Sequence, residues 1–337
     1  RGGPGPGPPA RPAPVAQLVA RRPKPAAGAA GRSPRPFLSV ARVWHSATKR
    51  PSEGTSLRVG VGGQSVEISS SVRGKIDLME YRFDLAWDEV ASPDSDKLLN
   101  FSRDVVLMSQ VWPSVLLVSL TAQPKERPPG SPSDLIRGVA GALLEAQEEH
   151  EGATYIAVAA LGISGTDGVD LLVPGSAPSP GMPTLRKLAL VNSEDVEALA
   201  QTLDSKEGDS HRVVQIFVEW RVDSIQVWTT RIVVAELGRS DSSALDEAAM
   251  LHCVREWIEG SSRTRPFRST ALQRVLNQEK CWRTDGAIAV LSSFCGSVGG
   301  YAGADPAKCS EARARRMLNT LGGLHDKAHS LSRGRGT

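Results

Sequence analysis

The chain has 337 residues, enough for one large domain or two small ones, and either could bury a hydrophobic core. Its 40 Lys and Arg residues against 37 Asp and Glu residues leave a net charge of +3, which excludes a strong overall field directed at nucleic acid or anionic lipid. No stretch approaches about 18 consecutive apolar residues, so neither a membrane-spanning helix nor a membrane partner is predicted.

Residues 1–56 form the first predicted region, a disordered extension. Residues 1–36 contain ten of the 23 prolines, and residues 1–50 hold eight Arg and two Lys but no acidic residue. Such a segment cannot bury enough apolar surface to offset the entropy of ordering. Three interpretations stay open: a solvated tail, a transit peptide for a plastid or another organelle, and a nucleic-acid arm. Without a transit peptide, a cytoplasmic location is expected.

From residue 57 onward, short β-branched runs alternate with segments of helical spacing. The predicted strands are 57–61, 75–85, 113–120, 153–161, 187–192 and 213–219, then a hairpin over 221–237 and two last strands at 286–291 and 299–302. The predicted helices are 132–150, which follows Ser131 as the N-cap, 193–203, 243–259, 269–279 and 307–321. This alternation is typical of a parallel sheet covered by helices.

An open doubly wound sheet and a closed eight-stranded barrel both fit the alternation. The stretch 57–325 is close to the roughly 250 residues of a (β/α)8 TIM barrel. No G-x-G-x-x-G follows the first strand, which disfavours a dinucleotide-binding sheet. The sequence therefore predicts an α/β chain with a (β/α)8 barrel over 57–325, followed by a basic tail over 326–337.

Metal chemistry and disulfides have little support in the sequence. The four cysteines lie in the last quarter without a C-x-x-C pair, and the six histidines include no H-E-x-x-H motif. No metal is therefore expected. His211, just before the sixth predicted strand, is expected at the surface.

The second predicted strand carries charged residues at alternate positions. Glu80, Arg82 and Asp84 share one face because successive side chains of a strand point to opposite sides. Inside a barrel mouth, Glu80 and Arg82 would position an anionic or hydroxylated ligand. The alternative is a structural salt bridge.

The strand Asp77–Asp84 (DLMEYRFD) resembles the D-L-[VI]-E-[WYL]-R-x-D strand of the type I 3-dehydroquinate dehydratases. Residues 113–121 and 294–302 resemble two further segments of that family. The resemblance implies a TIM barrel of the shikimate pathway of aromatic amino acid biosynthesis. It also implies a lyase that converts 3-dehydroquinate to 3-dehydroshikimate plus water through a lysine imine, with no metal or organic cofactor.

The resemblance also implies where the site residues lie. Gln215 stands at the position of the imine-forming lysine, and Asn192 or Ser193 at that of the catalytic histidine, so no confident catalytic residue remains. Glu80, Arg82 and Ser310 are the implied substrate-binding residues.

We therefore expect a protein that binds a 3-dehydroquinate-like molecule and turns it over weakly or not at all. The alternative is a non-catalytic barrel that binds a hydroxylated carboxylic acid or a protein partner. Nucleic acid is not the expected partner. A homodimer and an origin in a multifunctional shikimate-pathway fusion stay open.

Overall fold

The computed structural model describes residues 36–45, 55–72, 75–90, 95–122, 130–131, 133–149, 153–180, 183–206, 210–221, 227–238, 243–260, 270–282, 285–298 and 310–333. Contacts divide the chain into residues 1–33 and 34–337, and all the described residues lie in the second unit. Most of the predicted disordered extension thus lies outside the described residues. None of the helices in the described ranges is long and apolar enough to cross a membrane.

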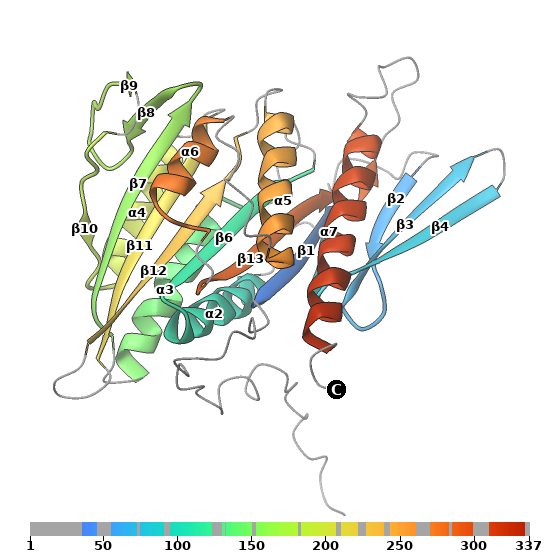
Figure 1. Cartoon of the computed structure of the whole chain (residues 1–337), viewed down its shortest axis with the longest axis horizontal. Helices are drawn as coiled ribbons and strands as arrows, with labels where there is room; N and C mark the ends of the chain where they lie inside the picture. Colours follow the sequence, from blue (N-terminus) through green and yellow to red (C-terminus); the bar gives the residue numbers. More distant parts are fainter. Residues whose placement is uncertain are drawn as a thin grey trace, which may run out of the picture. The chain divides into compact units, whose positions relative to one another are not determined.

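A mixed sheet of ten strands lies between two layers of helices (Figure 1). Its order is β5-β1-β13-β6-β12-β11-β7-β8-β9, and β10 also pairs with β7. Neighbours from β5 to β12 run parallel, whereas β11 is antiparallel to both β12 and β7. The strands are β1 (Phe37–His45), β5 (Leu85–Val90), β6 (Ser114–Thr121), β7 (Ala153–Ser164), β8 (Asp167–Asp170), β9 (Ser179–Pro180), β10 (Leu188–Ala189), β11 (His211–Arg221), β12 (Val227–Glu236) and β13 (Ala287–Cys295).

The central strands are nearly continuous apolar runs because helices cover both of their faces. All nine residues of β13 are buried, and the hydroxyl of Ser292 donates a hydrogen bond of 2.9 Å to the carbonyl of Val40. On β6, Val115 and Leu117 belong to one core, whereas Leu116 and Val118 belong to the other. The two cores therefore lie on opposite faces of one sheet.

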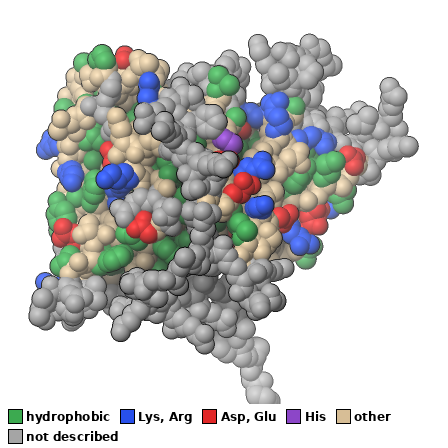
Figure 2. All heavy atoms as spheres, viewed as in Figure 1, with side chains coloured by type: hydrophobic (Ala, Val, Ile, Leu, Met, Phe, Trp, Pro, Cys, Tyr) green, Lys and Arg blue, Asp and Glu red, His purple; other side chains and the backbone are tan. Residues whose placement is uncertain are grey.

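In the described part of the chain, helices cover both faces of the sheet (Figure 1). The first face is covered by α2 (Ser95–Val111), α3 (Asp134–Glu149) and α4 (Ser193–Ser205). The second is covered by α5 (Ser243–Glu259), α6 (Ala271–Gln278) and α7 (Ser310–Arg333). The sheet and the helices on its two faces make a three-layer α/β fold. Charged side chains of both signs gather on the outer side of α7 (Figure 2).

A smaller antiparallel sheet adjoins the β1 region. Its order is β14-β2-β3-β4, with β14 (Ser297–Val298), β2 (Thr55–Val59), β3 (Ser65–Val72) and β4 (Lys75–Arg82). Helix α7 contacts β4 at Gly322, where an added Cβ would lie 3.4 Å from the ring of Tyr81. The glycine thus lets the helix lie close to that ring.

The predicted (β/α)8 barrel is wrong, because the sheet is open and runs from β5 at one end to β9 at the other. The pattern misled because strand–helix alternation is common to barrels and open sheets. The antiparallel pair β11–β12 lies within the sheet, which an all-parallel barrel does not allow. β1 falls inside the predicted disordered extension, so that prediction fails for residues 37–45. The last predicted strand, 299–302, lies outside the described residues.

The predicted helices are confirmed in position, as α3 to α7. Helix α7 continues through Arg333 and so includes most of the predicted basic tail. Helix α2 was missed, although Leu98, Phe101 and Val105 are all buried and have helical spacing.

Candidate functional site

The topology points to the carboxyl end of β6 as the place for a ligand. After β6 the chain crosses to α3 on the first face, whereas after the neighbouring strands β12 and β13 it passes to α5 and α7 on the second face. Connections that leave adjacent parallel strands toward opposite faces create a crevice, and ligands of open α/β sheets bind in such crevices. The carboxyl end of β6 and the start of α3 therefore form the candidate site.

Three backbone N–H groups at the N-terminus of α3 form hydrogen bonds with the chain's own groups. The backbone N–H of Ser131 donates to Oδ2 of Asp134 at 2.7 Å, that of Ser133 donates to Oγ of Ser131 at 3.1 Å, and that of Asp134 donates to the carbonyl of Ser131 at 3.1 Å. Pro132 has no N–H to offer. Three of the backbone N–H groups that could receive a phosphate at this helix end, those of Ser131, Ser133 and Asp134, are therefore engaged.

A second carboxylate reaches the same helix end from α4. Asp204 accepts hydrogen bonds from the hydroxyls of Ser131 at 2.5 Å and Ser133 at 2.7 Å. Because the N-terminus of a helix carries partial positive charge, the Asp204 and Asp134 carboxylates are stabilised there. Arg137, one turn further along α3, pairs with Asp134 and with Glu197 of α4, the latter at 2.9 Å.

The connection before α3 does not have the composition of a phosphate-cradling loop. Such loops need glycines that let successive backbone N–H groups face the ligand, followed by a lysine, as in G-x-x-x-x-G-K-[ST]. Residues 122–133 contain one glycine and four prolines, and that motif occurs nowhere in the 337 residues. Each proline removes one backbone donor.

Charged groups beside this edge of the sheet pair with one another. Arg212 of β11 contacts Glu236 of β12 at 2.7 Å, with 11% and 12% of the two side chains exposed. His211 accepts a hydrogen bond from the backbone N–H of Gly238 at Nδ1 (2.8 Å), and its Nε2 lies 3.0 Å from Asp246 of α5. Burial would raise the pKa of Asp246, but hydrogen bonds from His211 and Thr270 lower it overall.

His211 is therefore not the surface residue that the sequence suggested. It is buried and joins the start of β11 to α5. Since Nδ1 accepts the amide hydrogen of Gly238, the ring carries its proton on Nε2, from which it donates to Asp246. These two hydrogen bonds connect the start of β11 to Gly238 and to α5.

The implied substrate-binding residues lie elsewhere. Glu80 and Arg82 are exposed on β4, the end strand of the smaller sheet as described, and not inside a barrel mouth. They line a hollow of about 310 Å³ between β4 and α7, together with Tyr81, Asn319, Gly322, Gly323 and Asp326. Ser310 is the first residue of α7.

The residues at the implied catalytic positions are not brought to that hollow. Gln215 is 3% exposed on β11, where it pairs with Ala159 and Val233 inside the main sheet. Asn192 is the N-cap of α4 and forms a capping box with Asp195, and Ser193 begins the helix. These two positions have local roles in starting a helix.

Comparison with known proteins identifies the class of fold. No family model matches the chain, and no curated protein matches it. The fold is similar to a solved structure described as the C-terminal motor and motor homology domain of Kar3Vik1 fused to a synthetic heterodimeric coiled coil. That similarity has a TM-score of 0.62 and 12% identity, over 86% of this chain and 84% of that chain.

Two further solved structures agree. The motor domain of the Kar3-like kinesin from Ashbya gossypii has a TM-score of 0.60 and 13% identity, over 87% of this chain and 99% of that chain. The motor domain of the kinesin-like protein Kar3 from Saccharomyces cerevisiae has a TM-score of 0.61 and 13% identity, over 87% of this chain and 99% of that chain. The chain therefore has the fold of kinesin motor domains, and at these identities the likeness extends to the fold alone.

This finding overturns the resemblance to type I 3-dehydroquinate dehydratases. The lyase activity, the place in the shikimate pathway and the 3-dehydroquinate-like ligand that it implied are wrong, because the chain has the kinesin motor fold and not the barrel of that family. The match over Asp77–Asp84 is a coincidence of local strand pattern.

Proposed function

We propose that this chain is a kinesin-motor-like domain that does not hydrolyse ATP and that acts in association with a protein partner, by analogy with the motor homology domain named in the heterodimeric Kar3Vik1 structure. The observation that carries this proposal is the N-terminus of α3, where the Asp134 carboxylate accepts the backbone N–H of Ser131 and the Asp204 carboxylate accepts the hydroxyls of Ser131 and Ser133. A triphosphate brought to this helix end would meet two carboxylates, whose negative charge repels it.

The sequence of the β6–α3 connection supports the same conclusion. Motor-type ATP hydrolysis depends on positioning and neutralising the phosphates, for which phosphate loops use glycines, a lysine and a hydroxyl that holds Mg²⁺. This chain spans 98–99% of several motor-domain chains, so the equivalent segment lies within it. That segment, between β6 and α3, has four prolines and no G-x-x-x-x-G-K-[ST].

The second candidate function is the one printed for a neighbour, a kinesin motor ATPase. The fold and its coverage favour this candidate, whose structure has a TM-score of 0.61 over 86% of this chain. A shared fold does not carry its activity along, since the chemistry resides in particular side chains. The two candidates make opposite predictions for nucleotide binding.

Fluorescent ATP binding and phosphate release separate the two functions. The full chain is titrated into a fluorescently labelled ATP analogue with Mg²⁺, and phosphate release is followed with and without polymerised tubulin. We expect no saturable binding below about 1 mM, which corresponds to a binding free energy weaker than about 4 kcal/mol, and no turnover above buffer.

Two matched lysine variants identify the source of any turnover. Lys125→Ala removes the lysine of the β6–α3 connection, and Lys97→Ala removes a lysine of α2. Turnover that Lys125→Ala abolishes and Lys97→Ala leaves intact would refute the non-hydrolysing function. Turnover that neither variant changes points to a contaminating ATPase.

A further inference from the structure

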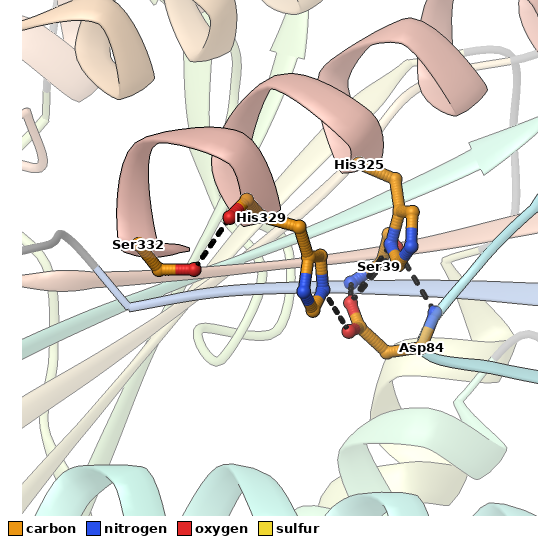
Figure 3. A network of polar contacts seen from close by, with 5 residues as sticks. All are labelled: Ser39, Asp84, His325, His329 and Ser332. Carbon is orange, nitrogen blue, oxygen red and sulfur yellow. Dashed lines mark hydrogen bonds and ion pairs between the residues drawn. The ribbon is translucent and has the colours of Figure 1, made fainter. Parts of the chain in front are cut away.

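Two histidines of α7 and one aspartate meet away from the β6 edge. Asp84 lies between β4 and β5, and His325 and His329 lie one turn apart on α7, so both rings point to the same side of the helix (Figure 3). Their potential ligand atoms, one from each residue, all lie within 4.8 Å of one another. Two imidazoles and a carboxylate are a common ligand set for transition metals.

The distances show that the three groups already face each other. Nε2 of His329 lies 2.8 Å from Oδ1 of Asp84, and Nδ1 of His325 lies 3.6 Å from Oδ2. The two rings have centroids 4.3 Å apart. Tetrahedral zinc with bonds of about 2.0–2.1 Å holds its ligand atoms roughly 3.3 Å apart. Shifts of about 1 Å would therefore suffice to bring the three groups around one ion.

Ser39 of β1 holds the carboxylate in place. Its backbone N–H and its hydroxyl donate to Oδ2 of Asp84 at 2.7 and 2.9 Å, and Oδ1 is left directed at His329. Its Oγ also lies 3.0 Å from Nδ1 of His325, a contact that a metal ion bound at Nδ1 would replace. Hydrogen bonds such as those from Ser39 to the carboxylate are the usual means by which proteins orient metal ligands.

The cluster is partly open to solvent. The side chains of Asp84, His325 and His329 are 20%, 11% and 44% exposed. The cluster is thus shielded on the β1 side and reachable by solvent at His329.

We propose that Asp84, His325 and His329 form a binding site for a divalent transition metal ion, zinc by ligand chemistry. Oδ1 of Asp84, Nδ1 of His325 and Nε2 of His329 are the ligand atoms, and water completes the fourth position. Two nitrogen ligands disfavour Mg²⁺ and Ca²⁺, which prefer oxygen. Bound metal would fasten α7 to the β1–β5 end of the sheet. The sequence has no H-E-x-x-H motif at this site. The four-residue spacing of His325 and His329, which places both on one side of a helix, is the sequence signal that could have indicated it.

Zinc titration of the untagged full chain, stripped with chelator, tests the proposal. We expect one equivalent of Zn²⁺ to bind, and the melting temperature to rise by roughly 5 °C at a hundredfold excess over Kd. Co²⁺ should give the visible absorption of a tetrahedral site, and Mg²⁺ should change neither readout. His329→Ala and Asp84→Asn should each weaken zinc binding by at least about tenfold.

A matched control separates this site from ordinary surface histidines. His45 lies 3.4 Å from Asp88, which makes a histidine–carboxylate pair, and it is not part of the three-group cluster. His45→Ala should leave zinc affinity unchanged. The proposal is overturned if wild-type protein, with native circular dichroism, binds no zinc below about 100 µM. It is equally overturned if His329→Ala and His45→Ala bind zinc as wild type does.

Discussion

Asp204 offers the sharpest test of how the end of α3 is built. Its carboxylate accepts hydrogen bonds from two hydroxyls, at 2.5 Å from Ser131 and 2.7 Å from Ser133, and Ser133 is fully buried. A hydrogen bond to an ionised group contributes about 1.5–3 kcal/mol. Because Asp204 is partly exposed, solvent reduces this value. We expect Asp204→Ala to lower the free energy of unfolding by about 2–4 kcal/mol.

Urea denaturation followed by tryptophan fluorescence measures this loss. Asp204→Asn keeps one acceptor but no charge, so it should lose about half as much. Glu148→Ala changes an exposed acidic residue of α3 and should stay within about 0.5 kcal/mol of wild type. In a double-mutant cycle, Asp204→Ala and Ser133→Ala should couple by about 1–2 kcal/mol.

The reasoning fails if Asp204→Ala unfolds at the same urea concentration as Glu148→Ala, or if the cycle with Ser133→Ala shows no coupling. Either result would mean that the helix end does not depend on this carboxylate. A phosphate site at this helix end would then no longer be disfavoured.

Three further predictions concern other parts of the fold. Burial raises the pKa of Asp104 on α2 to about 6, so its contribution to stability is present below the unfolded value of 3.8 and is lost as the pH rises through 6. Asp104→Asn should therefore stabilise the protein at pH 7 by less than about 3 kcal/mol after solvent screening. Urea curves of variant and wild type should converge near pH 3.5, and equal curves at pH 7 would contradict the assignment. Gly323→Ala places a methyl group where nothing lies within 4 Å, inside α7, and should raise stability by about 0.5–1 kcal/mol in thermal melts. A lower melting temperature would contradict this. Arg42→Ala leaves Glu89, 1% exposed and 2.6 Å from Arg42, without its cation, and should cost about 3–5 kcal/mol in urea. Replacing both residues by leucine should recover most of that loss, and a double variant as unstable as Arg42→Ala would refute the explanation.

The helices could be predicted from the sequence because their signals are local. The residues that start α3 and α4 and the spacing of their buried side chains lie within one short window, as for Val196, Leu199 and Leu203. The strand order could not be predicted in this way. β1 pairs with β13 about 250 residues away, and no local pattern specifies that partner. The composition of its surroundings placed β1 in a disordered extension, although all of its central residues are buried.

The same distinction explains why the strand from Asp77 to Asp84 misled. Charges at alternate positions suit a strand that faces a ligand, but they equally suit an end strand whose side chains face water. Glu80 and Arg82 are exposed on β4, and so is Met79, which lies between Leu78 and Glu80. The polar residues of this strand therefore face solvent and not the interior of a barrel. Only long-range contacts distinguish the two cases. Asp204 reaches Ser131 across 73 residues and His329 reaches Asp84 across 245. Both proposals depend on these long-range contacts, which bring a charged group from a distant part of the sequence to a defined point of the fold.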